Sequence, residues 1–262
     1  MPSCRSSVRA ALLGALAIVP AIRAQEASLD QIHPRRSISL GLGVGDQDIE
    51  TNSGTQIFSR SADALHIRLQ GEYFFQSDFG FFASGYIGTA DDINESLGST
   101  SSSFDSFGVF LAAAYRATMG DNFRLPVRFG PFFQSSEEDD STFTDGTIER
   151  TQFGVRLSAE PEYALSQTVS NGKVTEISVF AEFGCGAGPA SVKDDVDDED
   201  AYAFTLSWEV GFRYRFGNGI TAGLSWYDQK NHIGTTESYN NTAFFGLDDD
   251  FTGIMITAGL RF

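Results

Sequence analysis

Three things are scarce in this 262-residue sequence: lysine, cysteine and long hydrophobic runs. There are only three lysines, and Cys185 is the only cysteine after residue 24, so no disulfide can form within the rest of the chain. The formal charge of −17 becomes −20 without Arg5, Arg9 and Arg23, which argues against nucleic acid as a partner. Beyond residue 24, no stretch approaches the ~20 apolar residues that a membrane-spanning helix needs.

The first 24 residues have the composition of a secretory signal. Arg5 and Arg9 precede an apolar run over residues 10–22, and Ala24 stands before Gln25. A basic start, a short apolar segment and a small residue at the end are typical of a signal that is cleaved. We therefore expect residues 1–24 to be removed, residues 25–36 to form a periplasmic lead-in and residues 37–262 to form the barrel described below.

The mature sequence alternates between apolar and polar residues with a period of two, which is typical of β-strands. In one such stretch Phe204, Leu206 and Trp208 alternate with smaller or polar residues. The alternation predicts ten strands, over residues 37–45, 65–75, 79–89, 107–116, 123–134, 152–165, 174–185, 202–216, 220–227 and 251–262.

The predicted connections alternate between short and long. The short ones, which carry Asn, Gly, Asp or other residues suited to turns, are residues 76–78, 117–122, 166–173 and 217–219. The long and polar ones are residues 46–63, 90–106, 135–150, 186–201 and 228–250. Short turns on one rim and long loops on the other are typical of a membrane barrel whose termini lie at the short-turn rim. The predicted fold is an all-β transmembrane antiparallel β-barrel of about ten strands, with short periplasmic turns and long extracellular loops.

Charged residues within the predicted strands fall on a single face. A mid-depth Arg or Lys that faces lipid costs ~2–4 kcal/mol, so this face is expected to point into the barrel. Unpaired charges in a narrow interior of low dielectric are costly, so we predict a structural network of Arg–Glu pairs. The predicted members are Arg68, Glu72, Arg128, Arg156, Glu160, Glu182, Glu209 and Arg213.

The last strand of the sequence, residues 251–262, places Ile254, Ile256, Leu260 and Phe262 on one face. A closing amphipathic strand with a terminal Phe resembles the bacterial outer-membrane β-barrel proteins. The whole mature chain is similar to the small OmpA-like and opacity-type barrels. This resemblance implies an integral position in the bacterial outer membrane, contact with its lipid, and recognition by the barrel-assembly machinery through the strand that ends in Phe262.

Two local patterns are open to a binding interpretation. The glycines at 41, 43 and 45 do not open a helix, so they do not indicate a phosphate loop. The acidic segment 194–200 lacks the glycine and the ligand spacing of an EF-hand, so we interpret it as a hydrated loop. Diffuse Ca²⁺ bridging to lipid phosphates is the alternative for that segment. We expect no cofactor, no metal site and no catalytic residue.

Ten-stranded surface proteases that resemble the omptins need paired aspartates and an Asp–His pair at the outer rim. Candidates for the pair are Asp63 with His66 and Asp228 with His232, and Asp91-Asp92 could supply carboxylates. Their spacing does not match the family's motif, so we predict that the protein is not an enzyme.

Two functions remain after these exclusions. In the first, the protein is a surface interaction or envelope-structure barrel with a lumen filled by side chains, acidic surface loops and an unidentified surface ligand. In the second, it is a narrow porin-like channel for small solutes or cations. Barrels of about eight strands have interiors that side chains can fill, whereas open aqueous channels have ~16–18 strands, so the sequence favours the first function.

Overall fold

The computed structural model describes residues 33–52, 57–75, 78–91, 103–140, 146–170, 173–193, 198–235 and 246–262. The predicted signal and residues 25–32 of the predicted lead-in lie outside these ranges, as do residues 194–197 of the acidic segment. The described part of the chain contains no helix that is long and apolar enough to cross a membrane.

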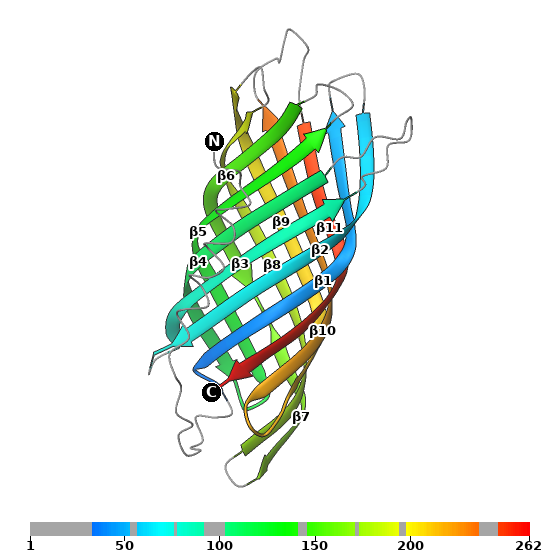
Figure 1. Cartoon of the computed structure of the whole chain (residues 1–262). Coiled ribbons are helices and arrows are strands. Elements are labelled where there is room, and N and C mark those ends of the chain that lie inside the picture. Colours follow the sequence, from blue (N-terminus) through cyan, green and yellow to red (C-terminus); the bar gives the residue numbers. More distant parts are fainter. Residues whose placement is uncertain are drawn as a thin grey trace.

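Eleven strands form one closed antiparallel barrel (Figure 1). They are β1 (Arg36–Asn52), β2 (Ile57–Phe74), β3 (Phe79–Asp91), β4 (Ser103–Met119), β5 (Phe123–Asp140), β6 (Gly146–Ala159), β7 (Glu162–Ser170), β8 (Lys173–Lys193), β9 (Asp198–Arg215), β10 (Ile220–Thr235) and β11 (Gly246–Arg261). Strands pair with their neighbours in sequence, except that β6 and β7 each pair with β5 and β8, and the pairing of β1 with β11 closes the wall. The predicted all-β barrel and its closing strand are confirmed.

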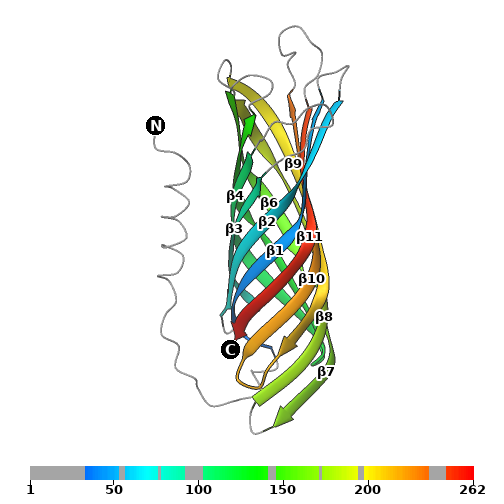
Figure 2. The same cartoon turned by 45° about the vertical axis from the view of Figure 1, so that its right-hand side comes forward.

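Strands β6 and β7 occupy one position in the wall, so the eleven strands make a ten-stranded barrel. β6 pairs with the outer half of β8, and β7 pairs with the half of β8 nearer the other rim. Pro161 separates them, because proline has no backbone N–H to donate to a ladder. The single strand predicted at residues 152–165 therefore spans this break. The β7–β8 hairpin extends past the rest of its rim (Figure 2).

The strands continue further toward the outer rim than the sequence predicted. Most of the predicted loop 46–63 is strand, and only residues 53–56 separate β1 from β2. In β1 the outward side chains change from Val44 to Asp46, while Ile49 is buried inside. Strands likewise take up all of the other predicted loops except residues 92–102, 141–145, 194–197 and 236–245. The hydrophobic face thus switches from outside to inside within one strand.

This switch divides the outer wall into two zones. The apolar belt is the uncharged outward surface, with Leu40 54%, Leu224 55% and Ile256 61% exposed. Above it lies the acidic collar, made of the outward residues Asp46, Asp48, Glu50, Asp63, Asp105, Glu137, Asp139, Glu149, Asp200, Asp228, Asp248 and Asp250. An uncharged band bounded by charge is the surface that a bilayer requires, because charge facing lipid is costly.

The short turns and the closing strand's end lie at one rim. The turns around Gly120 and Gly219 use left-handed backbone, with φ of 64° and 86°, which glycine adopts without steric cost. The opposite ends of the strands form the other rim, above the acidic collar (Figure 1).

Tags at the two rims would test the direction in which the barrel is inserted. A tag placed after Asp140, between β5 and β6, is expected to be labelled on intact cells. A matched tag at Asn218, in the β9–β10 turn, is expected to be labelled only after the outer membrane is permeabilised. The opposite pattern would mean that the short-turn rim faces outward.

Candidate functional site: the lumen

All eight residues of the predicted charge network lie on the inward face of the wall. The strands place them there because inward and outward side chains alternate from residue to residue. Arg68 and Glu72 come from β2, Arg128 from β5 and Arg156 from β6. Glu182 is on β8, Glu209 and Arg213 are on β9, and Glu160 lies between β6 and β7.

Arg128 is the centre of the largest group of ion pairs. Its Nε lies 3.0 Å from Glu72, its Nη2 lies 2.7 Å from Glu160, and its Nη1 lies 3.7 Å from Glu182. Its guanidinium also lies over the ring of Phe82, 4.2 Å from the centroid. The side chain is 4% exposed, so a cation and three carboxylates share one buried site. Each charge there depends on the others for compensation.

Arg213 connects this group to the short-turn rim. Its Nη1 lies 3.0 Å from Glu160 and 3.2 Å from Glu162. Glu162 in turn accepts two hydrogen bonds of 2.9 Å from Arg261, the last residue of β11. Arg124 lies 3.2 Å from Glu162 and contacts Glu176 as well. The pairing of inward charges therefore links strands from all around the barrel.

Two further members of the predicted network differ from each other. Arg68 donates to Glu209 at 2.6 Å, and Glu209 also accepts a 2.6 Å hydrogen bond from Ser225. Arg156, by contrast, donates to the hydroxyl of Ser207 at 2.5 Å and lies over the Phe110 ring. The sequence grouped Arg156 with the paired arginines, but in the structure its contacts are neutral.

The residues just before β1 lie across the short-turn opening. The backbone N–H groups of Arg35 and Arg36 donate to the carbonyl of Phe262, and the carbonyl of Pro34 accepts from Arg116 of β4 at 2.5 Å. The pKa of His33 is lowered by burial and by the positive charges of Arg124 and Arg116. A cavity of about 30 Å³ remains between this segment and the ion pairs. The lead-in predicted as a simple approach to the barrel thus ends as a cover over its mouth.

A second ion group lies near the outer rim, where the sequence predicted loops. Glu138, which is fully buried, lies 2.5 Å from Arg60 and also contacts Arg150. Nearby, Gln47 donates to Asp249, whose pKa burial raises to about 6 even though Arg150 opposes that rise. The sequence analysis missed these residues because they lie in the parts of the strands above the belt. There the apolar side chains point inward instead of outward. Reading the alternation in both phases would have found them.

Apolar side chains fill the rest of the outer half of the lumen. One buried cluster comprises Ile49, Ala62, Ala64, Ala90, Phe104, Tyr227, Phe251 and Met255. Another comprises Ala190, Ala201, Ala203, Ile233 and Leu247, with Val192 packed against it. Apolar packing inside a polar outer surface is the arrangement of a water-soluble barrel. It is expected here because this part of the wall lies above the apolar belt and is surrounded by water.

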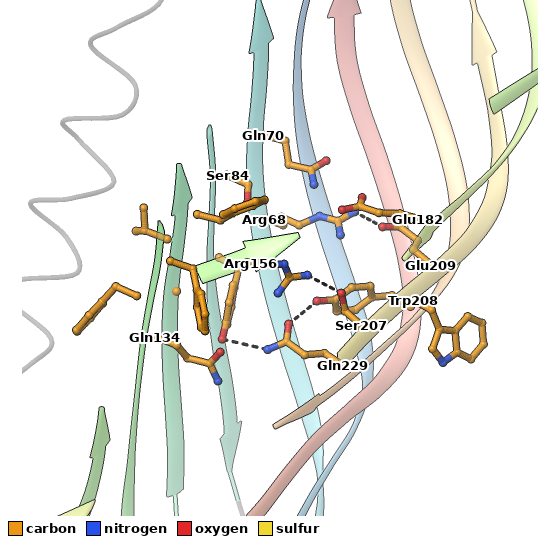
Figure 3. A pocket seen from close by; sticks show the side chains of 17 residues that line it. Arg68, Gln70, Ser84, Gln134, Arg156, Glu182, Ser207, Trp208, Glu209 and Gln229 are labelled. Carbon is orange, nitrogen blue, oxygen red and sulfur yellow. Dashed lines mark hydrogen bonds and ion pairs between the residues drawn. The ribbon is translucent and has the colours of Figure 1, made fainter. Parts of the chain in front are cut away.

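Between the apolar outer half and the ion pairs lies a cavity of about 40 Å³, the mid-lumen cavity. Figure 3 shows Arg68 directed toward Glu209, Arg156 directed toward Ser207, and Trp208 directed away from the cavity. One water needs roughly 10–15 Å³ of such space, so the cavity has room for about three waters.

In the described residues, neither candidate histidine contacts the aspartate that the sequence proposed for it. His66 points inward and is stacked on Phe251, with ring centroids 3.7 Å apart, whereas Asp63 points outward on the same strand. His232 lies on the outside of the wall, 2.5 Å from Asp248. In the described ranges, no three His, Cys, Asp or Glu side chains are arranged to hold a metal ion.

The family described as outer membrane protein beta-barrel domain matches residues 10–172 of the chain. A search of curated proteins finds no match. Similar solved structures include the outer membrane protease OmpT from Escherichia coli, 8% identical over 86% of this chain and 97% of that one, with a TM-score of 0.48.

The transport unit of the autotransporter AIDA-I from Escherichia coli is 7% identical over 98% of this chain and 97% of that one, with a TM-score of 0.47. Neisserial surface protein A is 11% identical over 87% of this chain and 97% of that one, with a TM-score of 0.30. At such low identity, these likenesses say nothing about activity.

Proposed function

The chain belongs to the outer membrane protein beta-barrel domain family and is integral to the outer membrane, and from this premise we propose that it acts as a closed, non-enzymatic barrel in surface interaction or envelope structure. The observation that carries the proposal is the filled lumen. Ion pairs occupy the half near the short turns, and apolar clusters occupy the outer half. The mid-lumen cavity between them has room for about three waters, which is too little for a continuous aqueous pore.

The acidic collar supports a role at the cell surface. On β1, β10 and β11 its residues lie side by side, with Asp48 paired in register to Asp250 and Glu50 to Asp248. Asp250 contacts Lys230 and Asp248 contacts His232, whereas the collar's other carboxylates repel one another unless cations or a cationic partner compensate them. A surface partner of positive charge is therefore the chemistry that this part of the molecule favours.

Two partners at the envelope itself are part of the proposal. The apolar belt is the surface that would contact outer-membrane lipid. The closing strand β11 would be recognised by the barrel-assembly machinery through its end at Phe262, whose backbone bonds to Arg36 complete the wall. A substitution of Phe262 that slows insertion in cells, but not refolding in detergent, would support this role.

The non-enzymatic part of the proposal rests on the placement of the histidines. His66 is 3% exposed inside the lumen, where a polypeptide could not reach it. His232 and Asp248 form a pair on the outer wall, but the wall there faces away from the mouth of the barrel. Among the described residues, neither arrangement brings an Asp–His pair and a second carboxylate pair to opposite sides of a cleft; Asp92 of the candidate pair Asp91-Asp92 lies outside the described residues.

Conductance measurements test the proposal against a narrow porin-like channel. We expect the refolded protein to be silent in planar bilayers, once its insertion is verified by heat-dependent gel mobility. The single substitution Glu209→Ala should also stay silent, because the apolar cluster around Phe104 still closes the outer half. Adding Phe104→Ala and Phe251→Ala to Glu209→Ala should produce openings, which would show that the assay can detect them. Steady ohmic conductance from the unmodified protein would contradict the proposal and support the channel.

A further inference from the structure

The arginines of the lumen outnumber its carboxylates. Ten arginines are described on the inward face: Arg60, Arg68, Arg116, Arg124, Arg128, Arg150, Arg156, Arg213, Arg215 and Arg261. Eight carboxylates face them: Glu72, Glu138, Glu160, Glu162, Glu176, Glu182, Glu209 and Asp249. The difference, ten minus eight, is an excess of two positive charges. Among the described residues, therefore, not every inward arginine can have an inward carboxylate of its own.

Arg156 and Arg116 are two inward arginines whose hydrogen bonds and ring contacts in the described residues are with neutral groups. Arg156 donates to Ser207 and lies 5.7 Å from the Phe110 ring centroid. Arg116 donates to the Pro34 carbonyl and lies 4.3 Å from the Phe74 ring centroid. Each of the two lines a cavity: Arg156 the mid-lumen cavity and Arg116 the one beneath the lead-in. Both arginines therefore have neutral hydrogen-bond partners and lie beside empty space.

The surroundings of Arg156 hold its guanidinium at the cavity. A Cβ at Gly184 would lie 2.5 Å from Nη2 of Arg156 and 2.7 Å from the hydroxyl of Ser207, so the glycine leaves room for this contact. Only Nη2 is hydrogen-bonded, although a guanidinium offers five N–H donors. The remaining donors are available to the space that Arg156 lines, together with the amide of Gln134 and the hydroxyl of Ser84.

The carboxylates of the same cavity are already used by other arginines. Glu209 accepts from Arg68, and Glu182 shares Arg128 with Glu72 and Glu160. Their presence nevertheless sets a limit on any ligand, because a multivalent anion would be repelled by two nearby negative charges. The volume of about 40 Å³ sets a second limit, since it accommodates only a few atoms.

We propose that the mid-lumen cavity is a binding site for a small monovalent anion of the halide class, held by Arg156. The anion accepts hydrogen bonds from the guanidinium donors of Arg156 that its contact with Ser207 leaves available. The site is then a structural part of the closed lumen.

Bromide is the probe for this site, because its anomalous scattering distinguishes it from water. Crystals of the refolded barrel grown in sodium bromide are expected to show an anomalous peak in the cavity beside Arg156. The peak should be lost in Arg156→Gln and retained in Ser84→Ala, which alters the same cavity without changing its charge. Arg156→Lys, which keeps the charge, should also retain bromide and serves if Arg156→Gln does not refold.

Either of two results would overturn the proposal. A cavity of the unmodified protein that contains only water at high bromide would mean that Glu182 balances Arg156 across solvent. A bromide peak that persists in Arg156→Gln would mean that Arg156 does not hold the anion. Neither result depends on whether the barrel conducts, so the anion site and the closed-barrel function can fail separately.

Discussion

Replacing Arg128 with Met is expected to lower the free energy of unfolding of the refolded barrel by ~3–5 kcal/mol, the usual cost of removing one partner from a buried ion pair. Arg128 is 4% exposed and is shared by Glu72, Glu160 and Glu182. Methionine fills similar space without charge, so three buried carboxylates lose their common cation. The measurement is urea unfolding in detergent micelles, followed by tryptophan fluorescence.

Arg156→Met is the matched control for this loss. It also removes an inward arginine from the wall, but the partner left behind is the hydroxyl of Ser207. We expect a smaller loss of about 1 kcal/mol, the net worth of an ordinary hydrogen bond. Alternation along the strands predicts only that both arginines point inward. The difference in the expected loss of stability comes from their partners in the structure. Equal losses in the two variants would mean that the lumen is wet enough to screen its charges.

Replacing Leu40 with Arg is expected to destabilise the membrane-inserted barrel by ~2–4 kcal/mol, because a cation then faces the lipid near mid-depth. Leu40 is 54% exposed on the outward face of β1, between Leu69 of β2 and Ala258 of β11. Neither neighbour offers a counter-charge. The measurement is folding into lipid vesicles at increasing urea, with the folded fraction read from gel mobility.

Asp48→Arg places the same side chain on the same face of the same strand, within the acidic collar. Its neighbours in register are Asp250 and Ser61, so the new cation lies beside a carboxylate in water. A change within about 0.5 kcal/mol is expected, as for exposed substitutions generally. A loss as large as that of Leu40→Arg would place the lipid boundary above Asp48 and would remove the distinction between belt and collar.

The extent of the strands shows where a local pattern stops being informative. Within the belt, Leu40, Leu42 and Val44 point outward, and alternation identified that stretch of β1 correctly. Above it the outward residues are acidic and Ile49 points inward, so the same strand was read as a loop. The cause is the change of solvent outside the wall from lipid to water. Sequence periodicity read in one phase cannot follow that change.

The sequence by itself determined the fold class, the closing strand and the inward direction of all eight predicted network residues, because a period of two is a property of each strand alone. Only the tertiary structure decided the partners. Arg68 pairs with Glu209, 141 residues away in the sequence, whereas Arg156 has no carboxylate partner among the described residues and donates to Ser207. Pairing depends on the register between strands and on the tilt that closes the wall, and these are fixed by the whole barrel rather than by any one strand.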